Sequence, residues 1–229
     1  DRLKFHHPKV LSEQKSLEDS NAACFDTFVK WLLDNGAKFP GLYFKCYGND
    51  QRGVHCKEDI PPNKRIMYIP LRCLITDQMA RRTPTGQKLL GIEKRLSAPN
   101  HNQIIVFMLE DMRNEKSFFK PYYDILPKDV TNFPVFWTEK EVRYLQGSNL
   151  PEEIVQRRKK IRSDYEIIGD LLPDFFEHVT FDKFLWCRTI VGSRNFTITI
   201  GTSKRTSMVP QADMLNHYRP RETSWTFEN

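Results

Sequence analysis

The sequence predicts an α+β fold in which a core of short β-strands is interrupted by a mostly helical insert. Around residues 41–76, and again around 196–217, short apolar runs alternate with turn-forming residues, which is the pattern of short strands joined by turns. Between these stretches, from residue 77 to about 178, apolar residues recur at helical spacing. Strands, a helical stretch and strands again indicate a β-core with an inserted helical subdomain.

The composition is that of a soluble globular protein. Of the 229 residues, 39% are hydrophobic and 28% are charged, so the chain can bury a core and keep a polar surface. No apolar run approaches the roughly 18 residues of a membrane helix. The opening "DRLKFHHPKV" lacks the apolar segment of a secretory signal. We therefore expect an intracellular protein, cytoplasmic or nuclear, with no membrane partner.

The five cysteines predict neither a disulfide framework nor a zinc site. Their number is odd and they are widely spaced, with no Cys-x-x-Cys pair and no Cys/His cluster at zinc-ligand spacing. Reduced thiols in an intracellular protein are the simplest interpretation. We expect no bound metal.

The chain is basic, with a net charge of +6 and a pI near 9.0, which would suit an acidic or nucleic-acid partner. Part of the excess comes from "QRRKKIR" at 156–162, which lies within a helical pattern. A charge run on a helix is usually a solvated face. Charge alone therefore does not favour nucleic acid as a partner, and no motif reports the oligomeric state.

The N-terminal third predicts a leader, one helix and several strands. Residues 1–20 are polar and without periodicity, so we expect a loose leader there. Residues 21–77 are expected to hold the N-terminal helix and the first half of the β-core. The apolar residues of the helix fall at helical spacing: Phe25, Phe28, Val29, Leu32 and Leu33. Asn35-Gly36 is a plausible stop signal.

Residues 78–178 are expected to form the helical insert. "NHNQIIVFMLEDMRNE" (100–115) has one apolar face. "WTEKEVRYLQG" (137–147) opens with Thr138 and Glu141 at capping-box spacing. "LPEEIVQRRKKIRSDYEIIGDLL" (150–172) starts with a proline and two glutamates, which favour a first helical turn. The aromatic, proline-rich stretch 118–137 is interpreted as a packed loop.

Residues 179–229 are expected to form the second half of the β-core. "TFDKFLWCRTIVGSRNF" (180–196) predicts a helix capped by Thr180. "FTITI" (196–200) predicts a strand, and "GTSKRTS" (201–207) a polar turn. "MVPQADMLNH" (208–217) begins as an apolar strand end and finishes in polar residues.

Three segments together resemble a known family. They are "RGVHCKEDIPPNKRIMYIP" (52–70), "SRNF" (193–196) and "ADMLNH" (212–217). In this order and at this separation they resemble the SET-domain protein methyltransferases, in the subgroup typified by the RuBisCO large-subunit methyltransferase, whose SET core carries a long helical insert. The resemblance extends from about residue 21 to the end. It implies a SET-type β-core, S-adenosyl-L-methionine as cofactor, and methyl transfer to a protein substrate, with the ε-amine of a lysine as the favoured acceptor.

The resemblance also implies which residues of the first motif hold the cofactor. Residue-by-residue matching places Asp50, Arg52 and Gly53 along its methionine part, and a glycine lets the backbone approach a ligand closely. Relatives usually carry Gly-x-Gly here, whereas this chain has Gln51-Arg52-Gly53.

The other two motifs are implied to hold the rest of the cofactor. Arg194 matches the family arginine, whose guanidinium can bind a carboxylate through two parallel hydrogen bonds. Asn216 and His217 match the family's Asn-His pair, so Asn216 would accept from the cofactor amine and the His217 backbone would meet the adenine. These polar groups would cluster because a charged cofactor must be held inside an apolar core.

Five residues are implied to surround the acceptor: Ser193, Phe196, Asp213, Trp225 and Phe227. Asp213 would face the acceptor channel or orient Arg194. An amine must be neutral to attack, and a desolvated aromatic slot beside a sulfonium charge disfavours the ammonium form. Phe196 suits such a slot, which favours lysine over histidine as the acceptor.

No residue of this chain is assigned a catalytic role, because the family's catalytic tyrosine would follow the final "SWTFEN". The resemblance therefore describes a chain truncated at its C-terminus, for which activity on its own is not assured. A catalytically incompetent SET-like module that binds peptides stays open as an alternative, as does histidine as the acceptor. A basic nucleic-acid-binding domain would rest on charge alone.

Overall fold

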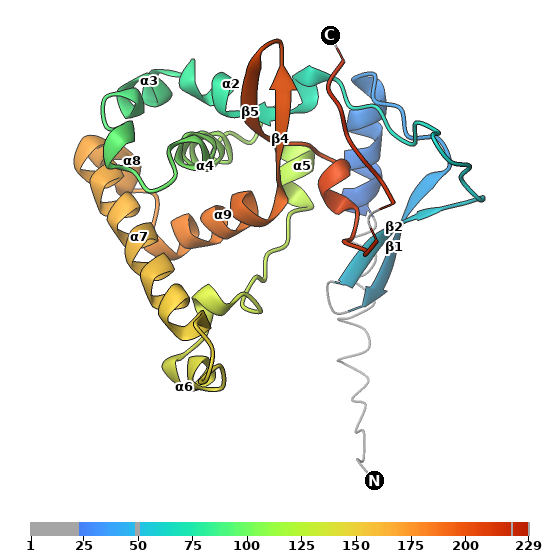
Figure 1. Ribbon diagram of the computed structural model, residues 1–229. Helices are drawn as coiled ribbons and strands as arrows, with labels where there is room; N and C mark the ends of the chain where they lie inside the picture. Colours follow the sequence, from blue (N-terminus) through green and yellow to red (C-terminus); the bar gives the residue numbers. More distant parts are fainter. Residues whose placement is uncertain (1–22, 49–50, 221, 229) are drawn as a thin grey trace, which may run out of the picture. The chain divides into compact units, whose positions relative to one another are not determined.

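The computed structural model describes residues 23–48, 51–220 and 222–228 (Figure 1). The predicted leader lies outside these residues. The chain divides into two compact units, each built from separated pieces of sequence. The first unit is the chain up to Cys73, with Phe118–Leu126 and Pro210–His217; the second is Leu74–Ser117, Pro127–Val209 and the chain from Tyr218 onward. Helices and two small antiparallel sheets confirm the α+β class.

In the first unit, residues 23–34 form the predicted helix. It buries Phe25, Phe28 and Leu32, as expected. Leu33 was expected on the same face but is 51% exposed, because it lies about 100° around the helix from Leu32. The helix ends at Gly36, whose φ of 89° is a conformation that favours glycine.

A hairpin packs against this helix. β1 (Leu42–Gly48) and β2 (Gln51–Cys56) pair antiparallel, with a register shift between Cys46 and Gly48 that makes Tyr47 a bulge residue. The ring centroid of Phe44 lies 4.7 Å from that of Phe25 and 6.1 Å from that of Phe28. This aromatic contact fixes the hairpin on the helix.

Three short helices complete the first unit: η1 (Leu71–Cys73), α5 (Lys120–Asp124) and η4 (Ala212–Met214). The expected loop at 118–137 is therefore only partly a loop. Pro121 occupies the first turn of α5, where a proline costs no hydrogen bond, so the prolines that suggested a loop are compatible with a short helix.

The second unit contains a three-stranded antiparallel sheet in the order β3-β5-β4. Its strands are β3 (Ile75–Thr76), β5 (Ser203–Met208) and β4 (Asn195–Ile200). The polar turn expected at 201–207 is wrong beyond residue 202. A two-residue loop that starts at Gly201, with φ of 61°, already reverses the chain, and polar residues then continue as β5.

Helices make up the rest of the second unit. They are α2 (Asp77–Arg81), α3 (Pro84–Leu90), η2 (Glu93–Arg95), α4 (Pro99–Asp111), η3 (Pro134–Phe136), α6 (Glu139–Arg143), α7 (Leu150–Leu171), α8 (Pro173–Phe176) and α9 (Phe181–Arg194). In Figure 1, α4 is seen nearly end-on, with α2 and α3 above it, α7 beside it and α9 below.

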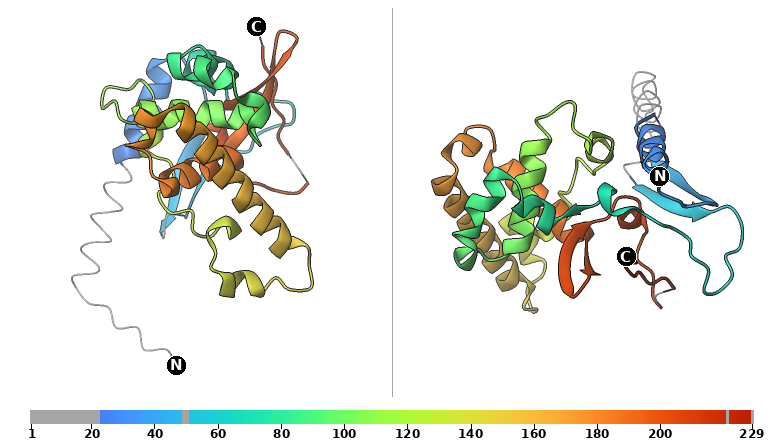
Figure 2. Two further views of the ribbon diagram at one scale, coloured as in Figure 1. Left: turned by 90° about the vertical axis from the view of Figure 1, so that its left-hand side faces the viewer. Right: turned by 90° about the horizontal axis from the view of Figure 1, so that it is seen from above.

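The expected helix signals are found in this unit. Every residue of α4 from Asn102 to Val106 is buried, which makes α4 the centre of the unit. The capping box of Thr138 and Glu141 opens α6, which lies by the N-terminal end of α7 (Figure 2). Thr180 caps α9 by accepting a hydrogen bond from the Lys183 amide. Across the described part of the chain, no helix has both the length and the apolar character to cross a membrane.

Candidate functional site

In the first unit, Asn216 lies against strand β2. Its Nδ2 donates to the carbonyl of Arg52 at 3.4 Å, across 164 residues of sequence. A Cβ added to Gly53 would lie 3.1 Å from the same Nδ2, which is tighter than an ordinary contact. The glycine therefore keeps the backbone open to close approach. Two of the three motifs meet here.

Two residues beside Gly53 were missed by the sequence reasoning. Tyr47 and His55 lie 3.8 Å and 3.7 Å from the position that a Cβ on Gly53 would take, and the Tyr47 hydroxyl is hydrogen-bonded to His55 Nε2. His55 shares a strand face with Gly53, since alternate residues of a strand point the same way. That spacing was the available signal for His55, whereas the bulge that brings Tyr47 here has no clear signature in sequence.

The other residues predicted in the first and third motifs are placed as follows. The Arg52 guanidinium lies over the Phe25 ring, 5.2 Å from its centroid, so its carbonyl and not its charge meets Asn216. His217 is exposed at the end of the same segment. Asp50 lies outside the described residues.

Asp213 is held by a buried tyrosine from α5. The Tyr122 hydroxyl donates to Asp213 Oδ2 at 2.8 Å, and the Tyr122 ring is fully buried, 6.2 Å from that of Phe28. The turn that leads to Asp213 passes through Gln211, which has a φ of 74° and is buried. A non-glycine residue with positive φ is strained, so the surrounding contacts must hold it there. Tyr122 was also missed, because no local pattern links it to Asp213 across 91 residues of sequence.

In the second unit, the last turn of α9 carries Ser193 and Arg194. Ser193 Oγ donates to the carbonyl of Thr189 at 2.8 Å, so this hydroxyl is engaged inside the helix. The side chain of Asn195 donates to the Val191 carbonyl at 2.8 Å and closes the helix end. Arg194 is half-buried at the negative end of the helix dipole, which favours a cation.

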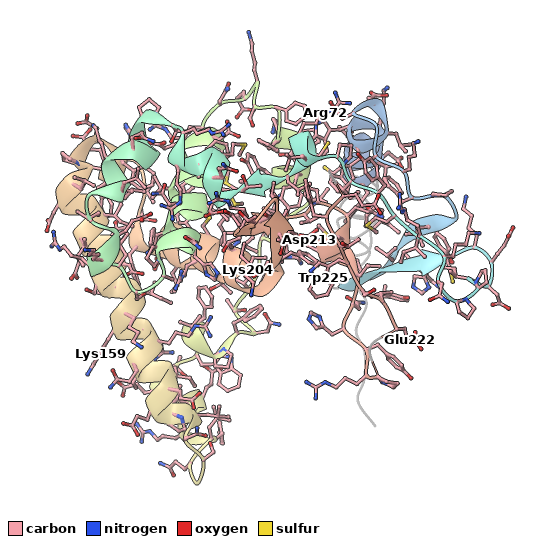
Figure 3. All side chains as sticks on the ribbon, turned by 45° about the horizontal axis from the view of Figure 1, so that its top comes forward. Arg72, Lys159, Lys204, Asp213, Glu222 and Trp225 are labelled. Carbon is pink, nitrogen blue, oxygen red and sulfur yellow. The ribbon has the colours of Figure 1, made fainter. Side chains whose placement is uncertain are left out.

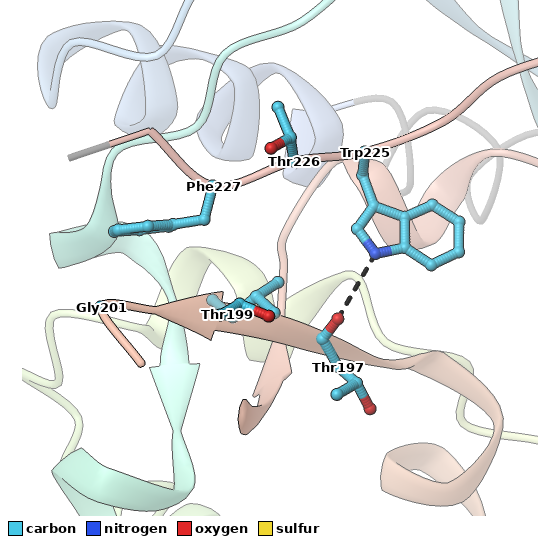
Figure 4. A pocket seen from close by; sticks show the side chains of 7 residues that line it. Thr197, Thr199, Gly201, Trp225, Thr226 and Phe227 are labelled. Carbon is cyan, nitrogen blue, oxygen red and sulfur yellow. Dashed lines mark hydrogen bonds between the residues drawn. The ribbon is translucent and has the colours of Figure 1, made fainter. Parts of the chain in front are cut away.

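Phe196 and Trp225 form an aromatic pair in the same unit. Their rings meet edge to face, with centroids 5.3 Å apart and an interplanar angle of 89°. Trp225 Nε1 donates to the carbonyl of Thr197 at 3.5 Å, which holds the C-terminal segment along β4 (Figure 4). The two predicted aromatic residues of that segment, Trp225 and Phe227, both line a hollow here.

The hollow measures about 310 Å³. It is lined by Thr197, Ile198, Thr199, Gly201, Trp225, Thr226 and Phe227. Ser207 of β5 stands opposite Phe196 in the strand register, is fully buried, and its Oγ has no hydrogen-bond partner among the described residues. Nothing in the sequence distinguished Ser207 from other strand serines. Aromatic rings and hydroxyl groups thus make up the chemistry of this region.

The described residues contain no group of three or more histidine, cysteine, aspartate or glutamate side chains arranged to hold a metal ion. The polar groups described above are amides, hydroxyls, backbone carbonyls, guanidinium groups, the Asp213 carboxylate and the His55 imidazole. Such groups bind charged organic molecules and orient them.

Comparison with known proteins gives consistent relatives. No protein-family model matches the chain. It is 29% identical, over 206 residues, to the chloroplastic ribulose-1,5 bisphosphate carboxylase/oxygenase large subunit N-methyltransferase of Pisum sativum, covering 87% of this chain and 40% of that protein. It is 26% identical to the chloroplastic [fructose-bisphosphate aldolase]-lysine N-methyltransferase of Arabidopsis thaliana, covering 83% and 39%.

A relative with a different acceptor matches more of the chain. The human actin-histidine N-methyltransferase is 23% identical over 224 residues, covering 91% of this chain and 37% of that protein. The chain thus spans about two fifths of the length of the curated relatives it matches.

Solved structures agree with these relatives. The SET domain of LSMT bound to methyllysine and AdoHcy superposes with a TM-score of 0.74 at 25% identity, covering 88% of this chain and 46% of that one. Rubisco LSMT bound to AdoMet superposes with a TM-score of 0.71 at 26% identity, covering 86% and 45%.

Proposed function

Because the chain has the SET-domain fold of these protein methyltransferases, we propose that it binds S-adenosyl-L-methionine and serves methyl transfer to a side chain of a protein substrate. The resemblance expected from the three motifs is confirmed by relatives and solved structures alike. The expected location, in the cytoplasm or nucleus, and the absence of a nucleic-acid partner stay predictions.

The approach of Asn216 to Gly53 is the observation that carries the cofactor proposal. S-adenosyl-L-methionine has a charged amino-acid part, which needs backbone at close range and hydrogen-bonding side chains around it. The residues present fit this need. A side chain at position 53 would meet Asn216, and Asn216 donates one amide hydrogen to the Arg52 carbonyl while its oxygen can accept from an ammonium group.

The remaining cofactor contacts are proposed from the match to the family. Arg194 would bind the carboxylate with its guanidinium fork. Asp50 would lie along the methionine part, and the His217 backbone would face the adenine. Asp213, which accepts from Tyr122, would act as a fixed carboxylate. The cofactor supplies an electrophilic methyl group on a sulfonium when it is bound.

The acceptor is proposed to be a lysine of the substrate. Phe196 and Trp225 offer an apolar, aromatic surface. The uncharged hydroxyl of Ser193 already donates to the Thr189 carbonyl. A dry aromatic slot lowers the pKa of an ammonium group, so it favours the neutral amine that attacks. Aromatic faces also hold methylated ammonium groups. The residues then act by alignment, since in-line methyl transfer requires no protein nucleophile.

Histidine is the second candidate acceptor, because the human actin-histidine N-methyltransferase matches 91% of the chain. The two acceptors can be separated with peptides that present a lysine or a histidine in otherwise identical sequences, assayed with labelled cofactor. Transfer to the lysine peptide alone is expected. Transfer to the histidine peptide alone would overturn the lysine assignment and leave the methyltransferase proposal intact.

Binding of the product S-adenosylhomocysteine tests the cofactor proposal, measured by calorimetric titration. Arg194→Ala is expected to weaken binding by about 10- to 100-fold, because a charge-assisted bidentate pair is lost. Arg162→Ala is the matched control: it removes an exposed guanidinium that stacks on the Phe181 ring and should leave affinity unchanged. Equal affinities of all three proteins would overturn the role of Arg194.

Alanine substitutions at Gly53 and at a control glycine test the close approach of Asn216 to Gly53. Gly53→Ala should weaken S-adenosylhomocysteine binding by about tenfold, because the new methyl group displaces Asn216 from β2. Gly91→Ala adds the same atom to a helix end in the second unit, where the nearest atom, the Lys88 carbonyl oxygen, would be 3.5 Å away, and should not change binding. Absence of binding to the unmodified chain would contradict the cofactor proposal.

A further inference from the structure

Helix α9 carries a guanidinium group with one buried nitrogen that no described residue hydrogen-bonds. Arg188 is half-buried, its Nη1 is fully buried, and that atom has no hydrogen-bond partner among the described residues. Burial lowers the pKa of Arg188, which expresses the cost of keeping this charge out of water. A buried charge normally has an opposite charge in contact, so Arg188 calls for an anion.

The nearby carboxylate of Asp164, on α7, does not fill this role. It is 1% exposed and accepts three hydrogen bonds from neutral donors: the Ser97 amide at 2.7 Å, Ser97 Oγ at 2.6 Å and Asn102 Nδ2 at 2.8 Å. Its charge is close enough to raise the pKa of Arg188, yet the two groups form no ion pair. Asp164 is therefore committed to fixing the start of α4.

Two more groups converge on Arg188 from neighbouring helices. Arg157 lies two turns before Asp164 on α7, and its Nη2 is 3.6 Å from the position that a Cβ on Gly192 would take. Gly192 follows Arg188 by one turn of α9, so the two guanidinium groups lie over the same helix face. Gly192 leaves space beside them.

His101, on α4, is the third group. It precedes Asn102, which binds Asp164. Burial, and after it the charges of Arg188 and Arg157, together lower its pKa to about 4. Two permanent cations and one titratable group thus converge from α4, α7 and α9. The buried carboxylate there, Asp164, is occupied by neutral donors, and Glu152 and Glu153 line a surface hollow with Arg157.

We propose that Arg188, Arg157 and His101 bind a small tetrahedral oxyanion of the phosphate class at the junction of α4, α7 and α9. Guanidinium groups bind phosphate oxygens in pairs, and a dianion with oxygens on several sides can meet groups that come from three helices. Arg157 is exposed, so it gives the anion a route in from solvent. The site lies wholly within the second unit and does not depend on the proposed function.

Titration of the chain with inorganic phosphate tests the proposal. Two readouts are used: the ring resonances of His101, assigned with His101→Gln, and the thermal midpoint. Phosphate should shift the resonances saturably and raise the pKa of His101, because an anion stabilises the imidazolium. At about tenfold excess over Kd the midpoint should rise by about 3 °C. Sodium chloride at matched ionic strength should do neither.

Variants separate this site from a general charge effect. Arg188→Met keeps the apolar stem and should weaken phosphate binding at least about tenfold. Lys159→Met removes one positive charge from a side chain that projects outward from α7, and should bind phosphate as the unmodified chain does (Figure 3). Arg157→Met changes an exposed residue, so it gives a second test if Arg188→Met fails to fold.

Two outcomes would overturn the proposal. One is the absence of a saturable response to phosphate in the unmodified chain. The other is an equal response in the Arg188→Met or Arg157→Met variant. O-phosphoserine supplies a further arm: tighter binding than inorganic phosphate would identify the source as a phosphoryl group on a peptide, and weaker binding would identify the free ion.

Discussion

Gly86 is the residue at which the backbone leaves least room. A Cβ there would lie 2.0 Å from the carbonyl oxygen of Ala80, and because that atom is backbone it cannot swing aside. We expect Gly86→Ala to destabilise the chain by about 3 kcal/mol through forced separation of α2 from α3. Urea unfolding followed by circular dichroism measures this.

Gly91→Ala serves as the control for that prediction. Gly91 has a φ of −65°, and its nearest contact would be 3.5 Å away. The substitution should change stability by less than about 1 kcal/mol, and toward greater stability, because alanine restricts the unfolded chain. Equal losses in the two variants would show that backbone contact at Gly86 is not the cause.

The residues of the site differ in how far sequence could predict them. Gly53 and Asn216 were predicted because they stand in short motifs, but their contact with each other was not predicted. Tyr122 binds Asp213 across 91 residues, and no local pattern encodes such a contact. Ser207 became notable only through its burial and its position opposite Phe196. Long-range partners need the fold before they can be recognised.

At the scale of the element, α6 has a cap that responds to acid. The Thr138 amide and then its hydroxyl donate to Glu141, at 2.7 Å and 2.8 Å, and these bonds hold the pKa of Glu141 below its ordinary value. Because the folded pKa is the lower one, the cap contributes above the unfolded value of about 4.3 and is lost as pH falls through the folded pKa. The protection of α6 amides, measured relative to the intrinsic exchange rate at each pH, should therefore fall below about pH 4.

Thr138→Val tests this helix cap. It should raise the pKa of Glu141 only part of the way toward its ordinary range, because the backbone amide of residue 138 still donates to it. It should also speed exchange in α6 at neutral pH, as measured by NMR. Thr180→Val is matched, because Thr180 caps α9 in the same way but has Lys183 at the position of Glu141. Its effect on α9 should be the same at neutral and acid pH. An unchanged Glu141 titration in Thr138→Val would contradict the role of the box.

Helices and strands were not equally predictable. The helices with clear helical signals form where the sequence placed them: α4 with its apolar face, α7 with Pro151 and two glutamates in its first turn, and α9 with its Thr180 cap. Strand β5 was taken for a turn, because its residues from Ser203 to Ser207 are all polar. Its place in the middle of a sheet buries Thr206 and Ser207. Pairing on both sides overrode the local preference.

At the scale of the molecule, Cys187 is a probe for unfolding of the second unit. Its thiol is fully buried in α9, and burial raises its pKa, so both access and reactivity are suppressed. Alkylation of Cys187 should be at least about a thousandfold slower than that of the exposed Cys56 in native conditions. Mass spectrometry of labelled peptides gives both rates from one sample.

The urea dependence completes this experiment. Labelling of Cys187 should rise in parallel with the loss of helical circular dichroism, whereas labelling of Cys56 should barely change. Rapid labelling of Cys187 without urea would mean that α9 opens locally, contrary to its place in the core. The fold class was predictable from three motifs in order, whereas the sharing of each compact unit by separate stretches of sequence is seen only in the structure.

That shared construction has a consequence for synthesis. The first unit needs Pro210–His217, which leave the ribosome roughly 140 residues after Cys73. At translation rates of about 5–20 residues per second, the N-terminal helix and hairpin wait about 7–30 s for their last segment. During that interval Phe28 can pack against Phe44, but Tyr122 and Asp213 have not yet both reached their final positions. A nascent chain paused between these points would be the form that molecular chaperones meet.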